Sequence, residues 1–242
     1  MESKVFDRIE KKYLITKAQK KAILSAIRKR MHRDNYHKSE VFNIYFDNQN
    51  YDSIINSIDW IDFKAKIRAR SYKGYDRVFL EIKTKIRGEE ENIGHKRRIM
   101  ITRSDYDELI NKNISLVKLA KRKIEKKNDL QIAKEIDYFI KRFNLSPKVL
   151  VSYKRESYIN DEDLRITFDE DLRYRSEKLT FNRTKNDKMY FEDGQTVIME
   201  IKAHGVLPLW LVGIMSEQKI YPQQFSKIGN IYQLIKKKGN HV

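Results

Sequence analysis

Three cations alternate with small apolar residues in the segment KIRARSY, residues 66–72. Lys66, Arg68 and Arg70 stand two positions apart, so a β-strand would place all three on one face. Three like charges on one face repel each other. An edge strand could leave them in water, whereas a binding site for a polyanion would use them. The segment alone leaves both interpretations open, and the other segments have to decide.

The same alternation recurs on at least six segments with the pattern of a β-strand. An ordinary half-buried strand also places polar residues outward, but the repeated clustering of Lys and Arg weakens that explanation. If the strands close into an antiparallel barrel with helices outside, the charged faces line the lumen. Such a lumen must hold water and anions, because uncompensated buried charge is costly. Besides KIRARSY, the polar positions are Lys12, Lys83, Lys96, Arg98, Tyr153, Arg155, Arg165 and Lys202.

Carboxylates share the faces of these cations, at Glu10, Glu81, Asp169 and Glu200. One interpretation is ion pairing with the neighbouring Lys and Arg. The other is a hard divalent cation, Mn²⁺ or Mg²⁺, held between carboxylate and phosphate oxygens.

Alternating strands and amphipathic helices must position these residues. Thr16 is the expected N-cap of the first helix, and Ser104 with Asp107 gives a Ser-x-x-Asp signature for the next long helical section. The last helix is expected as one helix or as two broken at Gly229. Residues 66–72 and 78–85 are expected to form a hairpin, with 95–101 beside it. The other expected strands are 6–15, 41–47, 149–159, 164–175 and 196–205. The expected helices are 17–31, an interrupted helical section over 104–144, a short one after Pro208, and 223–238, while 51–58 is expected as a short helix or a turn.

Composition limits the possible functions. The chain has 242 residues, a net charge of +17 and no cysteine, which excludes disulfides, zinc–thiolate sites and a cysteine nucleophile. No linker or repeat is visible, so a single domain over 1–242 is expected. The first residues lack a signal-peptide core, and the longest apolar run, 206–215, is too short to span a bilayer. We therefore expect a location in the cytoplasm, or at the inner face of a membrane.

The basic charge predicts a polyanionic partner: nucleic acid, an anionic membrane or a phosphate-rich small molecule. A double helix would not fit the lumen of an eight-stranded barrel. The basic stretch 118–127 lacks the interleaved aromatic residues of single-strand binders. No nucleic-acid partner is therefore expected.

Seven segments resemble one known family, in the family's order: RIEKKYLI, KIRARSY, FLEIKTK, YKRESY, LRITFDEDL, VIMEIKAHG and FSKIGNIYQ. They are similar to the VTC domain, the polyphosphate-polymerase module of the vacuolar transporter chaperone, within the CYTH or triphosphate tunnel metalloenzyme superfamily. The resemblance covers nearly the whole chain. The chain looks like a stand-alone version without the SPX domain or membrane helices of the eukaryotic complex.

The resemblance implies an α+β fold: an eight-stranded antiparallel β tunnel with a charged lumen and amphipathic helices outside. It implies that Arg68, Arg70, Arg155 and Arg165 hold the β- and γ-phosphates of ATP. Glu200 would hold the metal, with Glu10 and Glu81 as further candidates. Gln224 departs from the family pattern, where a lysine is expected two residues before the serine. The expected phosphate-binding residues are Lys12, Lys83, Lys96, Arg98, Tyr153, Lys202, Ser226 and Lys227.

The expected function is a metal-dependent polyphosphate polymerase. The γ-phosphate of ATP would pass to a growing inorganic polyphosphate chain, releasing ADP; such transfer needs alignment, a metal and positive charge more than covalent help. One alternative is a tunnel triphosphatase, in which Glu10 or Glu81 orients water. Another is a polyphosphate-binding module without catalysis. The residues leave open the choice among these, the oligomeric state and a membrane-protein partner for the product.

Overall fold

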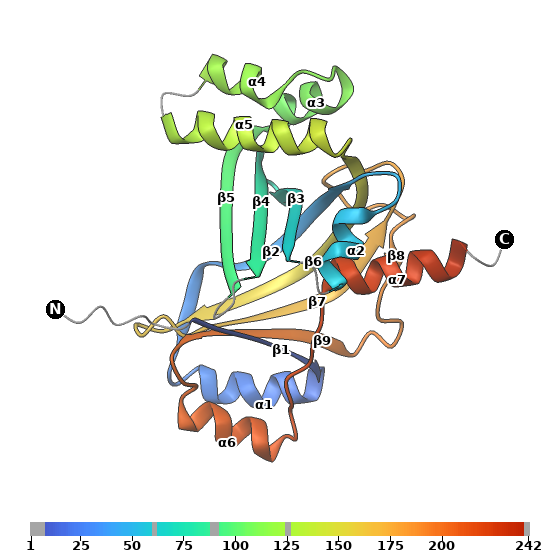
Figure 1. The fold of residues 1–242 in the computed structure, drawn as a ribbon. Coiled ribbons are helices and arrows are strands. Elements are labelled where there is room, and N and C mark those ends of the chain that lie inside the picture. Colours follow the sequence, from blue (N-terminus) through green and yellow to red (C-terminus); the bar gives the residue numbers. More distant parts are fainter. Residues whose placement is uncertain (1–7, 60–61, 88–91, 124–126, 240–242) are drawn as a thin grey trace. The chain divides into compact units, whose positions relative to one another are not determined.

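The computed structural model of the protein describes residues 8–59, 62–87, 92–123 and 127–239 (Figure 1). The chain divides into two compact units, each of which is described here by itself. The first unit comprises residues 8–40, 153–173 and 189–226, and the second comprises the described parts of 41–152, 174–188 and 227–239. The expectation of a single domain stays a prediction.

The fold is α+β, with a large antiparallel sheet in which eight strands follow the order β1-β9-β7-β6-β2-β3-β4-β5. A two-residue strand, β8, pairs with β7. The expected hairpin of β3 and β4, with β5 beside it, is confirmed. Closure of the sheet into a tunnel stays a prediction. The strands are β1 (Arg8–Thr16), β2 (His32–Asp47), β3 (Phe63–Tyr72), β4 (Arg77–Arg87), β5 (Asn92–Thr102), β6 (Ser146–Ile159), β7 (Arg165–Arg175), β8 (Lys188–Met189) and β9 (Thr196–His204).

The first unit packs two helices, α1 (Lys17–Ile27) and α6 (Leu209–Glu217), against the apolar side of its strands. Tyr13, Phe168 and Met199 are buried there, each from a different strand. Thr16 caps α1 as predicted: its hydroxyl accepts from the backbone N–H of Gln19 at 3.1 Å, and the Gln19 side-chain oxygen accepts from the Thr16 N–H at 2.8 Å. This core leaves the polar residues of the same strands on the side away from the helices.

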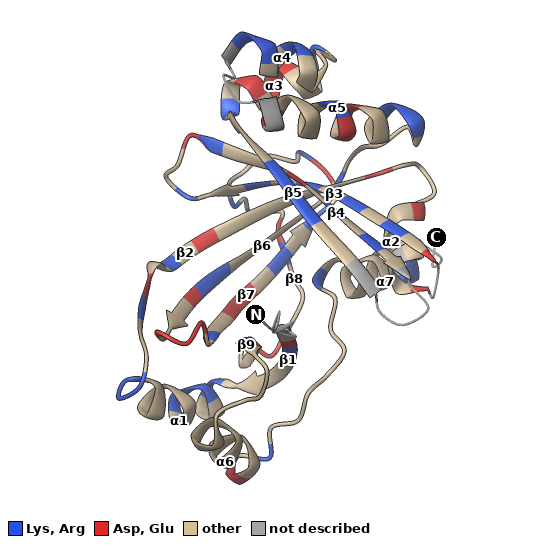
Figure 2. Cartoon of the chain, turned by 60° about the vertical axis from the view of Figure 1, so that its left-hand side comes forward, with Lys and Arg blue, Asp and Glu red and all other residues tan. Residues whose placement is uncertain are grey.

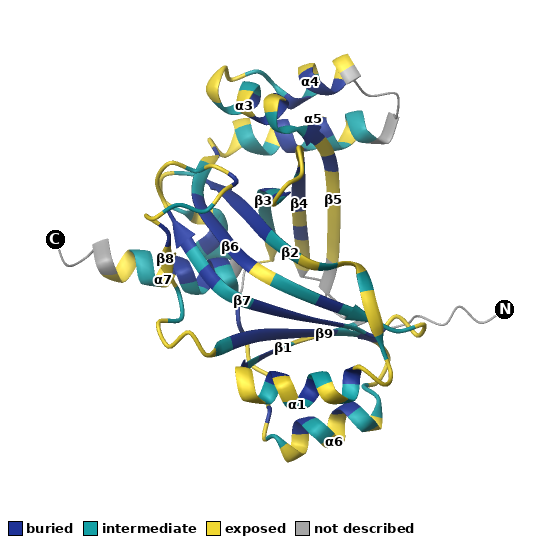
Figure 3. Cartoon of the chain, turned by 180° about the vertical axis from the view of Figure 1, so that it is seen from behind, coloured by how far each residue is buried: buried dark blue, intermediate teal, exposed yellow. Residues whose placement is uncertain are grey.

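The second unit contains α2 (Asp52–Ile58), α3 (Arg103–Asn111), α4 (Leu116–Lys123), α5 (Lys127–Arg142) and α7 (Lys227–Gly239). Ile44, Ala69, Leu80 and Ile99 lie side by side across β2 to β5 and are buried. They belong to one core with residues of α3, α4 and α5, and Figure 3 shows this burial. The cations of β3 to β5 alternate with these core residues, so they lie on the opposite face of the sheet.

Two expectations about element boundaries are wrong. Strand β2 begins at His32, well before the predicted start at residue 41. The N-cap of α3 is Thr102, paired with Asp105, and Ser104 lies inside the helix. For the last helix, the expected alternative of one unbroken helix is confirmed: α7 continues through Gly229. Its buried residues Ile228, Ile231 and Tyr232 lie on both sides of the glycine, and we attribute the unbroken helix to their packing, which can outweigh the weak helix propensity of one glycine.

Among the described helices, none has both the length and the apolar character that crossing a membrane would require.

Candidate functional site

Lysine and arginine recur along β3, β4 and β5 in the second unit (Figure 2), and the strand register places them on one face. The strand register sets Lys66 opposite Lys83, and Lys83 opposite Lys96, so three lysines form one row across the sheet. Like charges directly opposite each other destabilise a sheet. The row therefore favours an anion at this face. We call this the cationic face; its charged members are Lys64, Lys66, Arg68, Arg70, Lys83, Lys85, Lys96 and Arg98, with Glu81 as the acid among these described rows.

Glu81 sits in the middle of the cationic face, in the row Arg68–Glu81–Arg98. Its Oε2 accepts from Arg68 Nε at 2.7 Å and lies 2.6 Å from Arg68 Nη2, while its Oε1 lies 2.9 Å from Lys96 Nζ. The Glu81 side chain is 3% exposed and that of Arg68 25% exposed. The buried Glu81 carboxylate thus fixes the Arg68 guanidinium and leaves part of the Arg68 side chain accessible to solvent.

The electrostatics of this cluster follow from its charge. Burial alone would raise the pKa of the Glu81 carboxyl, but the charges of Arg68, Arg70 and Lys96 outweigh it and lower that pKa to about 2. Burial lowers the pKa of the Lys96 ammonium, and its contacts with Glu81 offset this only in part. Glu81 is therefore ionised at neutral pH.

Two further side chains orient the arginines of the cationic face. Asn43 on β2 accepts from Arg70 Nε at 2.8 Å and donates to the Val151 carbonyl at 3.3 Å. The Arg98 guanidinium lies 4.9 Å from the centre of the Phe79 ring, within cation–π range. The sequence argument missed Asn43 and Phe79, although both occupy the polar-facing positions of their strands and could have been found by extending the alternation.

The first unit holds a second cluster, centred on a bidentate ion pair on β6 and β7. Arg155 Nε and Nη2 donate to the two carboxylate oxygens of Asp169 at 2.6 and 2.7 Å, and the guanidinium lies 5.2 Å from the centre of the Tyr153 ring. Burial would lower the pKa of the Arg155 guanidinium, but Asp169 outweighs burial and raises it. Arg155 is thus a fixed, permanent cation.

Lys202 joins the two predicted metal ligands of the first unit. Its ammonium lies 2.9 Å from Glu200 Oε1 and 3.3 Å from Glu10 Oε2. The Glu10 side chain is 43% exposed and that of Glu200 11% exposed. Lys12, opposite Glu200 in the strand register, donates to the Phe225 carbonyl at 3.1 Å. The predicted residues Glu10, Lys12, Glu200 and Lys202 are therefore brought together.

The remaining predicted residues are Arg165, Ser226 and Lys227. Arg165 stands opposite Lys202 in the strand register and so belongs to the cluster of the first unit. Arg165 pairs with Asp34 and donates to the Ser157 hydroxyl at 3.3 Å, so its guanidinium is already engaged. Ser226 is the last residue of the first unit, and Lys227 begins α7 in the second.

A comparison with protein families decides what kind of chain this is. Residues 7–236 match the VTC domain. The chain belongs to the VTC domain family. The resemblance seen in the seven sequence segments is thereby confirmed.

A solved structure with a TM-score above 0.5 shares the fold of this VTC domain, and two further structures are similar to the chain. A protein from Hippeastrum, described as a candidate adenylyl cyclase with a dominant triphosphatase activity, is 13% identical with a TM-score of 0.52, over 92% of this chain and 93% of that one. A Pyrococcus horikoshii protein is 16% identical with a TM-score of 0.49, over 94% and 99% of the two chains. A candidate adenylate cyclase from Vibrio parahaemolyticus is 11% identical with a TM-score of 0.49, over 94% and 98%. No curated protein matches the sequence.

The residues around Glu200 fit a divalent cation that is shared with a ligand. No group of three or more potential metal-ligating side chains occurs in the described part of the chain, so protein atoms alone do not form a complete metal site there. Glu10 and Glu200, however, converge on one ammonium, and the hydroxyl of Thr167, opposite Glu200 in the register, is buried without a hydrogen-bond partner. Mg²⁺ commonly takes one or two carboxylates and completes its shell with phosphate oxygens and water.

Glu81 fits a metal less well than Glu10 and Glu200 do. Both of its oxygens already face cations, so a metal there would have to displace Lys96 or Arg68. Its metal-binding role stays a prediction.

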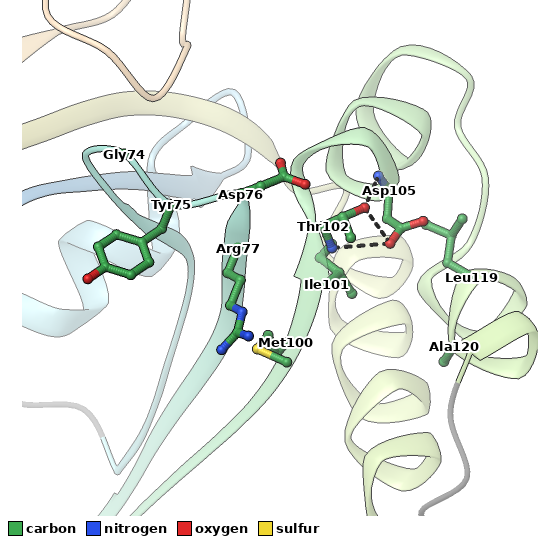
Figure 4. Close-up of a pocket in the computed structure, with 10 residues that line it drawn as sticks. All are labelled: Gly74, Tyr75, Asp76, Arg77, Met100, Ile101, Thr102, Asp105, Leu119 and Ala120. Carbon is green, nitrogen blue, oxygen red and sulfur yellow. Dashed lines mark hydrogen bonds between the residues drawn. The ribbon is translucent and has the colours of Figure 1, made fainter.

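A cavity of about 620 Å³ opens elsewhere in the second unit (Figure 4). It lies between the β3–β4 turn and α3–α4, and its lining includes Tyr75, Arg77, Met100 and Leu119. None of the predicted site residues lines it among the described residues. The charged strand faces, rather than this cavity, are the candidate site.

Proposed function

We propose that this VTC domain is a polyphosphate polymerase that transfers the γ-phosphate of ATP onto a growing inorganic polyphosphate chain. The proposal includes closure of the eight-stranded sheet into the tunnel that the family resemblance implies. It rests on membership of the VTC domain family and on the charge of the two strand clusters.

The observation that carries the proposal is the lysine row of the cationic face. Lys66, Lys83 and Lys96 stand opposite one another on adjacent strands, and the Glu81 carboxylate, which contacts Lys96, is shared with Arg68. Cations outnumber this carboxylate on the cationic face, which favours binding of an anion. A phosphate chain carries a negative charge at every unit and offers several acceptors per phosphate. It therefore matches a row of ammonium groups better than a single small anion does.

In each unit, a buried carboxylate fixes the orientation of an arginine that we propose to bind phosphate. Glu81 holds Arg68, and Asp169 holds Arg155, in each case through a buried carboxylate. An arginine held in advance loses less conformational entropy when its remaining N–H groups meet a ligand. We assign phosphate contacts to Arg68, Arg70 and Arg155.

The reaction step is a phosphoryl transfer. A terminal oxygen of the polyphosphate chain forms a new P–O bond to the γ-phosphorus of ATP, and the bond between that phosphorus and the β,γ-bridging oxygen breaks. ADP leaves with the electron pair of the broken bond. The attacking oxygen is already anionic, so the step needs no strong general base. The cations supply alignment and charge stabilisation.

Glu10 and Glu200 would hold Mn²⁺ or Mg²⁺ together with phosphate oxygens. When bound, such a cation neutralises charge on the transferring phosphate. Lys202, which contacts both carboxylates, keeps their negative charges compensated without the metal.

Hydrolysis of tripolyphosphate or nucleoside triphosphates is the second candidate. It is favoured by the exposed Glu10 carboxylate, which could orient a water molecule. Glu81 suits that role poorly because its carboxyl is buried, engaged by two cations, and very weakly basic with a pKa of about 2. The fold shared with the Hippeastrum protein, whose description names a triphosphatase activity, agrees with this candidate as well.

The test is to incubate the pure protein with ATP and Mn²⁺ and to measure polyphosphate, ADP and free phosphate. Long polyphosphate with ADP is the expected result. Free phosphate without polymer would refute the polymerase in favour of the hydrolase. Tight binding of tripolyphosphate without turnover would leave only a binding module.

Neighbouring arginines of β5 provide a matched pair of variants. Arg98 belongs to the cationic face, whereas Arg97 lies on the opposite face and pairs with Glu135 at 2.9 Å. We expect Arg98→Ala to weaken tripolyphosphate binding several-fold and Arg97→Ala to leave it unchanged, because only the first removes a cation from the binding face. Arg68→Ala should weaken binding by about tenfold or more. Equal effects of Arg98→Ala and Arg97→Ala would contradict the assignment of this face.

A further inference from the structure

Helix α6 of the first unit carries an apolar surface that the fold does not cover. Its inner residues Leu211 and Met215 are buried in the core. Leu209 and Val212, on the outer side, are 88% and 44% exposed, and Val206 just before the helix is 85% exposed. Leu209 and Val212 stand three positions apart, so they lie on one side of α6, and Figure 3 shows exposed stretches on this helix. Val206 lies in the segment just before the helix. We call Val206, Leu209 and Val212 the apolar strip.

The neighbouring helix α1 is basic on its outer side. Lys17, Lys21, Arg28 and Lys29 are exposed there, and the sequence from residue 11 to residue 33 contains no Asp or Glu. Arg30, which follows the end of α1, contacts α6.

Direct contacts hold the two helices side by side (Figure 1). The Arg30 guanidinium lies 5.3 Å from the centre of the Trp210 ring, and Gln19 donates to the Gln218 carbonyl at 2.9 Å. Trp210 follows Leu209 in the chain and packs partly against the core, and its ring carries the Arg30 cation at the boundary between α6 and α1. Apolar residues bordered by an amphipathic aromatic ring and by cations are typical of helices that lie in a membrane interface.

We infer that the apolar strip and the basic side of α1 dock onto the surface of an anionic phospholipid bilayer. The three apolar side chains enter the boundary between headgroups and acyl chains, and the Lys and Arg side chains of α1 meet lipid phosphates. Charge complementarity selects this occupant. A free phosphate chain would have no use for the apolar strip, and a second copy of the chain would bring another basic α1 against the first.

This surface is separate from the residues assigned above to phosphate binding, and the inference does not depend on the proposed enzymatic activity. The apolar strip lies at and beside α6, whereas Lys12, Arg155, Glu200 and Lys202 lie on strands, on the face away from that helix. Vesicle binding and tripolyphosphate binding should therefore respond to different substitutions.

The test is co-sedimentation of the protein with vesicles of equal parts phosphatidylglycerol and phosphatidylcholine, and with pure phosphatidylcholine vesicles. Saturating tripolyphosphate is present in both, so that the strand cations are occupied. We expect binding to the anionic vesicles, weakened by salt, and little binding to phosphatidylcholine alone.

Substitutions of exposed residues separate the contribution of the apolar strip to vesicle binding from that of the basic side of α1, with little risk to the fold. Leu209→Gln should weaken binding several-fold, and Lys29→Glu about tenfold or more, because a reversal removes one attraction and adds a repulsion. The matched controls are Tyr138→Gln and Lys118→Glu on α5 and α4, which replace an apolar and a basic residue with exposed side chains in the second unit. Both controls should bind like the unsubstituted protein.

Three results would overturn the inference. The first is no binding to anionic vesicles, and the second is equal loss of binding in the Leu209→Gln variant and in the Tyr138→Gln control. The third is a concentration-dependent dimer, seen by sedimentation equilibrium without lipid and abolished by Leu209→Gln, which would assign the strip to a second copy. Loss of polymerase activity in the assay above would leave the vesicle result unaffected.

Discussion

Replacing Glu81 by Gln tests the electrostatic reasoning about the cationic face. The substitution keeps the size of the side chain and removes the negative charge that Arg68 and Lys96 share. Because the carboxyl is almost fully buried, solvent screens this loss only weakly. We therefore expect a large effect on stability from a single charge.

The magnitude follows from the pKa of the carboxyl. Folding lowers the Glu81 pKa from 4.5 to about 2. Each pKa unit corresponds to about 1.4 kcal/mol, so ionised Glu81 contributes about 3 kcal/mol to the free energy of unfolding at neutral pH. Since the pKa is lowered on folding, this contribution is complete above pH 4.5 and is lost as the pH falls toward about 2.

The assay is urea unfolding followed by circular dichroism, at neutral pH and across the acidic range. Glu81→Gln should lose about 3 kcal/mol at neutral pH and should converge with the unsubstituted protein as the pH approaches the Glu81 pKa of about 2. The control is Glu108→Gln, whose carboxylate is 27% exposed and pairs with Arg122 at 3.0 Å on the helical surface. It should change stability by less than about 1 kcal/mol.

Tripolyphosphate adds a second readout to the same variant. The anion should stabilise Glu81→Gln more than the unsubstituted protein, because the variant has a larger excess of positive charge to neutralise. A stability loss in Glu81→Gln no larger than that of Glu108→Gln would refute the electrostatic reasoning. An equal gain from tripolyphosphate in both proteins would refute the placement of the anion at this face.

Three further outcomes are expected. Arg155→Met should cost about 3–5 kcal/mol in urea unfolding because it strands the buried Asp169 carboxylate, and adding Asp169→Asn should recover much of this; no recovery would mean that the pair matters only for packing. Thr102→Ala should lower the free energy of unfolding by about 1 kcal/mol through loss of the α3 cap, and an unchanged urea midpoint would contradict that role. Glu200→Gln should weaken retention of Mn²⁺ in the presence of tripolyphosphate, measured from the spin-resonance signal of the free ion; unchanged retention would remove Glu200 as a ligand, and the conservative Glu200→Asp should retain part of the binding.

Much of the sheet could be predicted from the sequence, because half-buried strands alternate in hydrophobicity. The faces of β3, β4 and β5 followed from that period alone. The cap of α1 at Thr16 followed from the preference for threonine at the N-cap of a helix. The start of β2 could not be found, since residues 32–40 are polar at both phases of the alternation. At α3 the predicted cap was Ser104 with Asp107, whereas the chain uses Thr102 with Asp105, two positions earlier.

The division into two units left no trace in composition. The boundaries at residues 40/41 and 152/153 fall inside β2 and β6, so each strand contributes one part to each unit. A linker would show as a run of Gly, Pro or Ser, whereas a strand that passes between units keeps its ordinary alternation. At the boundaries inside β2 and β6 no linker separates the units, so the sequence pattern gave no sign of them.

The sequence predicts on which strand face each charged residue of the candidate site lies, but not which cation each carboxylate pairs with. Alternation placed Glu81 and Asp169 among the cations, yet which cation each one binds depends on strand register and rotamers, which are set by turns and packing. The structure pairs Glu81 with Arg68 and Asp169 with Arg155. For Glu81, the ion-pairing interpretation of the sequence pattern is therefore the one that its geometry supports.

These two pairs explain how cationic strand faces can fold before any ligand arrives. Without an acid, adjacent arginines and lysines would repel and turn outward into solvent, and a ligand would have to reorder them. One buried carboxylate in each cluster cancels enough charge to fix an arginine in place. It does so without cancelling the whole cluster, because on the cationic face the Glu81 carboxylate is shared between Arg68 and Lys96. The buried acids thus set the position of the cations, and the surplus of cations leaves an attraction that a polyanion can satisfy.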